Sequence, residues 1–246
     1  MEKIQVERNL SHIRARINKA CEKAGRNPEE VKLLLATKTV SAENINRAIA
    51  AGESLIGESR AQELKEKHHL LQLDHADLHF IGHLQTNKVN QVLNYTSFIH
   101  SVDRIRLANR LHNRLTTEGR TANILIQVNT SYEESKFGVA PEAAIDFIEE
   151  VSKLDTLNIK GLMTIGKLSS EPEEARKCFR LLKSIQEEVE AQNIPSVEMD
   201  ILSMGMTDDF EIAIEEGSTM IRVGTAIFGE RMYPDSYYWN EQAPID

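Results

Sequence analysis

Residues 31–40 read VKLLLATKTV, an apolar segment rich in strand formers with a lysine, Lys38, near its end. In a strand, successive side chains point to opposite faces, which places Leu34, Ala36 and Lys38 on one face. Because burying an unpaired ammonium is costly, Lys38 either reaches water or a carboxylate at the strand end, or is a desolvated amine nucleophile. The segment alone favours the first interpretation, since most lysines at strand ends keep the amine in water.

This segment is the first of eight short apolar runs that alternate with amphipathic, helix-like stretches. Such alternation indicates βαβ units and a mainly parallel sheet. Eight strands in about 200 residues suit a closed barrel better than an open doubly wound sheet. The first strand also lacks the G-x-G-x-x-G turn of a dinucleotide fold. We therefore predict an α/β fold, a single (β/α)8 TIM barrel. The predicted strands are 32–40, 54–57, 78–83, 97–102, 123–129, 159–166, 197–205 and 219–229, and the predicted helices lie near 42–51, 59–73, 86–94, 103–118, 141–153, 172–192 and 208–216.

An extra amphipathic helix is predicted over about residues 2–24, before the first strand. Its apolar residues recur at helical spacing, and Gly25 follows as a stop. We expect this helix either to pack on the outside of the barrel or to close one end of it. The chain is then one domain over residues 1–246, with the extra helix in 1–25, the barrel in 31–231 and a short tail in 232–246. The apolar positions of the helix are Ile4, Leu10, Ile13, Ile17 and Ala20.

The bulk composition is ordinary for a soluble globular protein, with 41% hydrophobic and 27% charged residues in 246. A net charge of −9 argues against broad binding to nucleic acid or to an anionic membrane. The sequence shows no apolar run that spans a bilayer and no signal peptide, so we expect a cytoplasmic protein without membrane association. Cys21 and Cys178 lie far apart and indicate neither a disulfide framework nor a zinc site. No long apolar stripe demands a partner, and we expect a monomer.

Two loops at the end of the chain carry the residue types of a phosphate site. Barrel enzymes keep their active sites at the carboxyl ends of the strands, often with phosphate after strands 7 and 8. In SMGMTDDFEIAIEEG, after strand 7, Ser203 and Thr207 offer hydroxyls and Gly205 lets the backbone approach closely. In RVGTAIFG, Gly224 and Thr225 end strand 8 at a helix start, where N–H groups bind phosphate readily. Ordinary tight turns and helix caps explain the same residues equally well.

Lys38 ends strand 1, which neighbours strand 8 in a closed barrel. An amine and a phosphate site then face each other across one barrel mouth. A phosphorylated aldehyde that forms a Schiff base with lysine would satisfy both, and pyridoxal 5′-phosphate (PLP) is such a molecule.

Eight segments of the chain resemble a known family. They are LLLATKTV, IGESRAQELKEK, HFIGHLQTNK, IHSVDR, ILIQVN, SKFG, GLMTIG and SMGMTDDFEIAIEEGSTMIRVGTAIFG, in order from about residue 30 to 231. Together they resemble the pyridoxal phosphate homeostasis protein family. The resemblance implies a single-domain barrel similar to the amino-terminal domain of alanine racemase. It also implies a carrier or regulator of PLP without established turnover, with PLP-dependent apoenzymes as candidate acceptors.

The resemblance assigns roles to individual residues. Lys38 matches the family's Schiff-base lysine, and Arg222 falls on the strand beneath the pyridine ring. One departure is Ser59, which stands where the family usually has the asparagine of Gly-Glu-Asn, near the cofactor's ring oxygen. Serine still donates a hydrogen bond, but its side chain is shorter. Ser203, Gly224 and Thr225 match the phosphate-holding positions, and Met204 and Gly205 fall in the same loop.

Arg222 and two histidines allow other interpretations. Arg222 has an alternative role in a surface or barrel-bottom ion pair with Glu198 or Asp200. His79 and His83 have a metal-ligand spacing only in a helix, whereas in a strand they lie about 13 Å apart and cannot bind one ion. We therefore expect no metal site. His83, at a carboxyl end, is a further candidate for the pocket mouth.

Three functions remain open: a PLP homeostasis protein, a PLP-dependent racemase-like enzyme acting on amino acids, and a cofactor-free Schiff-base aldolase. A racemase needs a second base, which alanine racemase takes from a separate carboxyl-terminal domain of a partner chain. We expect no such domain here, because only a short tail follows residue 231. The prediction is a non-catalytic PLP carrier with no catalytic residue of its own.

Overall fold

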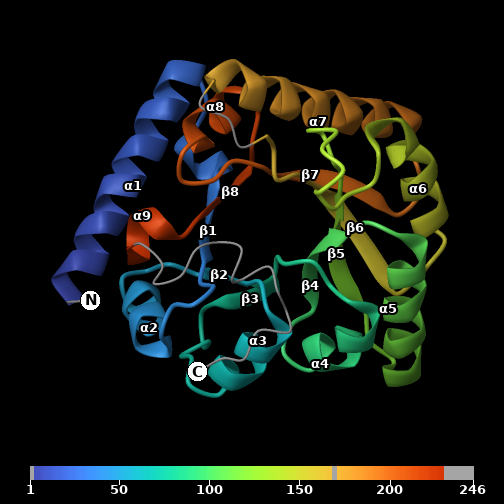
Figure 1. The fold of residues 1–246 in the computed structure, drawn as a ribbon, viewed down its shortest axis with the longest axis horizontal. Helices are drawn as coiled ribbons and strands as arrows, with labels where there is room; N and C mark the ends of the chain where they lie inside the picture. The colour runs from blue at the N-terminus through green and yellow to red at the C-terminus, as the bar shows by residue number, and fades with distance from the viewer. Residues whose placement is uncertain (1–2, 168–170, 230–246) are drawn as a thin grey trace.

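Eight parallel strands close into a barrel in chain order, β1 to β8 (Figure 1). The computed structural model describes residues 3–167 and 171–229, so the predicted tail, 232–246, lies outside the described residues. Pairing of β8 with β1, in which Leu34 stands opposite Arg222, completes the ring. The predicted (β/α)8 barrel is confirmed. The strands are β1 (Lys32–Ala36), β2 (Leu55–Glu58), β3 (Asp77–Phe80), β4 (Phe98–Val102), β5 (Ala122–Gln127), β6 (Leu157–Met163), β7 (Val197–Ser203) and β8 (Met220–Val223).

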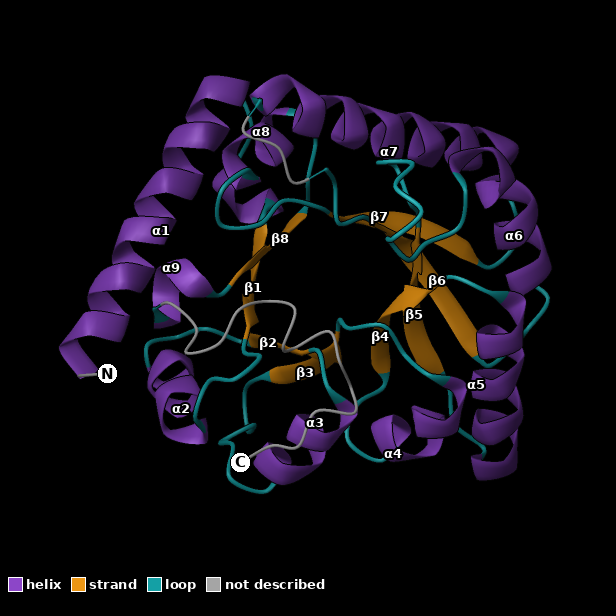
Figure 2. Cartoon of the chain, viewed as in Figure 1, coloured by secondary structure: helices purple, strands orange, loops and turns teal. Residues whose placement is uncertain are grey.

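Helices follow the strands and surround the barrel (Figure 2). Apolar side chains of the strands' outer faces and of the helices form one continuous layer between them. The helices are α2 (Ala42–Ala50), α3 (Ala61–His68), α4 (Val89–Leu93), α5 (Ile105–Glu118), α6 (Ala144–Val151), α7 (Pro172–Gln192), α8 (Phe210–Glu215) and α9 (Thr225–Phe228), with short 3-10 helices at Pro28–Glu30, Thr86–Lys88 and Pro141–Ala143.

The extra amino-terminal helix is α1 (Lys3–Ala24), and it packs on the outside of the barrel beside α2, α8 and α9 (Figure 1). Gly25 ends it with a φ of +66°, a conformation that glycine adopts without strain. Of the two predicted placements, the outer one is therefore found. Among the predicted apolar positions, the side chain of Ile4 is not described. Those buried against the barrel are Leu10, Ile13, Ile17 and Ala20, together with Val6 and Cys21.

Several strands end earlier than predicted. β1 ends at Ala36 instead of residue 40, because Val40 N–H bonds back to the carbonyl of Thr37 and forms a turn. The apolar run 219–229 divides at Gly224, since the N–H groups of Ile227 and Phe228 bond to its carbonyl and begin α9. Apolar composition alone does not mark these ends, because buried residues continue beyond them: Thr37 in the turn after β1, and Ile227 and Phe228 in α9.

Two further observations concern the class of protein. Cys21 and Cys178 are both buried and free. Within residues 3–167 and 171–229, we find no helix with the length and apolar character needed to cross a membrane.

Candidate functional site

Lys38 lies in a turn at the carboxyl end of β1, two residues beyond the strand. Its side chain is half-buried, so the prediction that it continues the strand is wrong, while its place at the barrel mouth is as predicted. Thr37 before it is fully buried and Thr39 after it is exposed. The turn therefore leads the chain from the wall of the barrel toward solvent, at the end where barrel enzymes keep their chemistry.

The end of β8 lies directly against the end of β1. A Cβ atom on Gly224 would stand 2.6 Å from the carbonyl oxygen of Ala36. Since Gly224 has a φ of −128°, the requirement for glycine is one of space and not of backbone conformation. This contact brings the loop after β8 next to the turn that carries Lys38.

The loops after β7 and β8 also meet each other. The hydroxyls of Thr207 and Thr225 lie 3.2 Å apart. Gly205 has a φ of +93°, and a Cβ there would lie 2.5 Å from the Cβ of Ala213, so the loop folds tightly over α8. The two predicted phosphate loops thus form one small surface of hydroxyls and backbone.

Met204, from the same loop, has a packing role. Its side chain is fully buried in the apolar layer. Its N–H donates to the carbonyl of Met220 at 3.1 Å, and its carbonyl accepts from Ser218 at 2.8 Å. With these groups committed to the fold, its contact with a cofactor stays a prediction.

Arg222 is buried and binds the end of β7. Its Nη1 donates to both the carbonyl and the hydroxyl oxygen of Ser203, at 2.7 and 2.8 Å. Its Nη2 donates to the carbonyl of Thr164 at 2.7 Å. Burial lowers the pKa of Arg222 to about 10, against the opposing effect of Asp209, so the guanidinium is still charged at neutral pH.

Among the described residues, Arg222 forms no ion pair with Glu198 or Asp200 of β7. Glu198 instead binds Lys160 at 2.6 Å. Arg222 and Ser203 form one hydrogen-bonded unit, which ties a predicted ring contact to a predicted phosphate contact.

His83 lies in the loop after β3, where its ring stacks on Phe137 with centroids 3.6 Å apart. Its Nδ1 is 3.6 Å from a carboxylate oxygen of Asp103. These contacts place it among the loops that follow β3, β4 and β5, at the mouth. His79, by contrast, is buried on β3 with Nδ1 2.8 Å from Nε2 of His100. The prediction that His79 and His83 lie on one strand is wrong, because β3 ends at Phe80 and His83 stands in the loop beyond it.

Ser59 follows β2 and lies against the loop after β3, where a Cβ on Gly82 would meet its carbonyl oxygen at 2.0 Å. The residue is half-buried at the mouth. Its hydrogen bond to the cofactor's ring oxygen stays a prediction.

A charged cluster beside the Lys38 turn was not predicted from the sequence. Lys67 of α3 binds Glu58 of β2 at 2.9 Å and Glu63 of α3 at 2.7 Å. Two signals could have found it: an acidic residue directly after the apolar run of β2, and a Glu–Lys pair spaced i, i+4 on the following helix.

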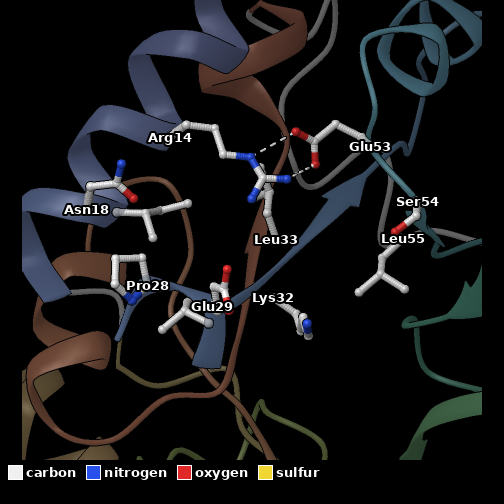
Figure 3. Close-up of a pocket in the computed structure, with 11 residues that line it drawn as sticks. Arg14, Asn18, Pro28, Glu29, Lys32, Leu33, Glu53, Ser54 and Leu55 are labelled. Carbon is white, nitrogen blue, oxygen red and sulfur yellow. Dashed lines mark hydrogen bonds and ion pairs between the residues drawn. The ribbon is translucent and has the colours of Figure 1, made fainter. Parts of the chain in front are cut away.

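A pocket of about 490 Å³ lies at the opposite, amino-terminal end of β1 (Figure 3). Arg14 of α1 reaches across it to Glu53, with hydrogen bonds of 3.0 and 2.6 Å. Lys32, at the first position of β1, also lines it. The pocket is separate from the barrel mouth. The ion pair between Arg14 and Glu53 beside it joins α1 to the barrel.

Comparison with known proteins identifies the family. A model described as alanine racemase, N-terminal domain, matches residues 8–232. A pyridoxal phosphate homeostasis protein of Aquifex aeolicus is 42% identical over 224 residues, which cover 91% of this chain and 97% of that protein. The chain belongs to the pyridoxal phosphate homeostasis protein family. Recognition of this family from the quoted segments is thereby confirmed.

Solved structures agree with this assignment. PipY of Synechococcus elongatus, with PLP bound, is 32% identical to this chain and superposes on it with a TM-score of 0.80. The superposition covers 92% of this chain and 100% of the PipY chain. Alanine racemase of Clostridium difficile is 15% identical with a TM-score of 0.71, and only 58% of that chain is covered. The second likeness shows the fold alone.

Proposed function

We propose that this chain binds PLP through a Schiff base with Lys38 and serves in PLP homeostasis, without catalytic turnover of its own. The observation that carries the proposal is the contact of Gly224 with Ala36, because it brings the loop after β8 to the turn of Lys38. The names of the relatives and the PLP-bound structure of PipY support the same function.

The residues at the mouth fit the group chemically. A half-buried primary amine stands on one side, and hydroxyls and a glycine with no room for a side chain stand on the other. When bound, PLP supplies an aldehyde that a lysine amine takes up as a C=N bond. Nζ gives up its two hydrogens and the aldehyde its oxygen, one water leaves, and nothing is oxidised or reduced.

The chain's own residues would divide the binding between them. Lys38 holds the aldehyde carbon, while Ser203, Gly224 and Thr225 hold the phosphate. Gly205 keeps the loop close, and backbone N–H groups at the start of α9 add donors. Ser59 and His83 are proposed at the rim.

Arg222 argues for a carrier over an enzyme. A charged guanidinium next to the pyridine nitrogen disfavours protonation of that nitrogen and so weakens the electron sink that amino-acid turnover needs. Its hydrogen bonds to Ser203 and Thr164 hold it on the inner face of β8. In this proposal the protein is a monomer that stores PLP or passes it to PLP-dependent apoenzymes.

The test is an absorbance spectrum of the purified protein with added PLP, followed by borohydride reduction and peptide mass mapping. We expect a visible band and a phosphopyridoxyl adduct on Lys38. Amino-acid turnover assays then separate a carrier from a racemase-like enzyme. Absence of the band after PLP addition would overturn the proposal and favour the aldolase.

A further inference from the structure

The turn that carries Lys38 has an uncommon backbone conformation. Val40 N–H donates to the carbonyl of Thr37 at 3.0 Å and closes a four-residue turn. Its third residue, Thr39, has a φ of +66°, a region that glycine or asparagine usually occupies and that a β-branched residue avoids. Contacts from outside the turn must therefore hold it in place.

On the amino-terminal side of Lys38, two of these contacts bind Thr37. Nζ of Lys67 donates to the carbonyl oxygen of Thr37 at 2.9 Å. The hydroxyl of Thr37 donates to Oε1 of Glu58 at 2.7 Å. Both partners come from outside β1, one from α3 and one from β2.

On the carboxyl-terminal side, Thr39 N–H donates to Oε2 of Glu63 at 2.8 Å. The same oxygen accepts from Nζ of Lys67 at 2.7 Å. Since an ammonium has three hydrogens, its bonds to Thr37, Glu58 and Glu63 use all of them. The cluster of Glu58, Glu63 and Lys67 thus binds both residues that flank the nucleophile.

The cluster is buried, and burying its charges carries a desolvation cost. Glu58 is 0% exposed and the Lys67 side chain 13%. Burial raises the pKa of Glu58, against the effect of Lys67. Burial lowers the pKa of Lys67, but Glu58 and Glu63 raise it by more, so the ammonium stays charged. Apolar replacements of buried ion clusters are often neutral or stabilising, and within the described part of the chain Oε2 of Glu58 has no hydrogen-bond partner.

The cluster lies outside the barrel wall. Ile56 packs in the apolar layer between strands and helices, and Glu58, two residues later, shares its face of β2. Gly57 points the other way, where a Cβ would meet the side chain of Leu34 at 2.3 Å. The cluster therefore lies on the outer side of β2, and its hydrogen bonds to Thr37 and Thr39 link it to the turn at 37–40.

We propose that Glu58, Glu63 and Lys67 are positioning residues, which hold the turn at 37–40 so that the amine of Lys38 meets the aldehyde of PLP. The inference rests on the proposed function and names residues that make the Schiff base form efficiently. It requires the cluster to affect formation of the Schiff base more than the non-covalent contacts that hold the phosphate.

Two ligands separate these parts. Pyridoxine 5′-phosphate carries an alcohol in place of the aldehyde and cannot form a Schiff base, so its dissociation constant reports the non-covalent contacts. In Glu63→Leu and Lys67→Met we expect PLP affinity to fall at least tenfold, pyridoxine 5′-phosphate affinity to change less than twofold, and borohydride-trapped Lys38 to form more slowly. Glu66→Leu, on the exposed face of the same helix, is the matched control and should behave as wild type.

Each other outcome overturns the inference. An equal loss of affinity for both ligands means that the cluster only supports the fold. Unchanged PLP affinity means that the turn does not need the cluster. Should Glu63→Leu fail to fold, Glu63→Gln keeps an oxygen for Thr39 but removes the charge opposite Lys67, and the PLP effect should still exceed that on pyridoxine 5′-phosphate severalfold. Wild-type protein that traps no adduct on Lys38 overturns the proposed function itself, and the inference with it.

Discussion

Gly224 and Ala36 are in such close contact that any side chain at residue 224 would collide with the backbone of β1, since a Cβ would lie 2.6 Å from the Ala36 carbonyl oxygen. The contact joins the last strand of the barrel to the first. It also couples the predicted phosphate loop to the turn of Lys38.

Gly224→Ala should therefore weaken PLP binding by about tenfold or more and destabilise the fold by roughly 1–3 kcal/mol, as overpacking does. Titration with PLP and chemical denaturation measure the two effects. Gly166→Ala is the control, because its Cβ would meet side-chain atoms, the ring of Phe179 at 3.2 Å and the Cβ of Cys178 at 4.0 Å, and no backbone atom. Wild-type PLP affinity in Gly224→Ala would show that the contact does not shape the site.

Lys38→Ala should abolish the borohydride-trapped adduct, because alanine has no amine, and leave the fold intact, because Lys38 is only half-buried and lies in a turn beyond β1. Peptide mass mapping and far-UV circular dichroism check the two statements. Lys32→Ala, at the opposite end of the same strand, should retain the adduct. Loss of the folded spectrum in Lys38→Ala would contradict this account.

Arg222→Glu should shift the visible band of bound PLP if the guanidinium faces the pyridine nitrogen. This substitution should also destabilise the fold. A carboxylate would stand against the carbonyls of Ser203 and Thr164, which should lower the free energy of unfolding by about 3–5 kcal/mol. Arg222→Gln keeps a donor and is the better folded variant for the spectrum. Arg180→Gln, on the exposed part of α7, is the control. An unchanged band in both Arg222 variants would rule out the ring contact.

The buried pair His79–His100 should make the protein less stable in acid. Burial lowers the pKa of His79 to about 4, and burial, with His79 and Arg222 beside it, lowers that of His100. Unfolded chains bind protons at these sites near pH 6.5, so this stability is full above about 6.5 and is lost as the pH falls toward 4. His79 alone contributes roughly 3 kcal/mol across that range.

Thermal unfolding at several pH values tests whether stability falls as the pH is lowered from about 6.5 toward 4. The double variant His79→Leu/His100→Leu removes both partners together and should flatten the pH dependence between 4 and 6.5. His69→Gln, an exposed histidine, should leave the dependence as it is. A double variant as sensitive to acid as wild type would assign the effect to other groups.

Much of the fold could be predicted from local patterns. An apolar run of strand formers in 31–40, together with seven further apolar runs separated by amphipathic stretches, indicates βαβ units. Helical spacing from Leu10 to Ala20 indicates α1. The chemical types near the mouth, a lysine after strand 1 and small or hydroxyl residues after strands 7 and 8, are also visible locally. The positions of strand ends were not, because the turn after Ala36 depends on bonds to Glu63 and Lys67 of α3.

By itself, then, the sequence determined the barrel, the family and the residue types at its mouth, because backbone periodicity and short motifs act over a few neighbouring residues. Only the tertiary structure decided which groups meet. Ring closure places Gly224 on Ala36, the order of β6, β7 and β8 gives Arg222 its oxygens at Thr164 and Ser203, and the pairing of β3 with β4 joins His79 to His100. These contacts link residues from 19 to 188 positions apart in the chain, and the assembled barrel sets their distances.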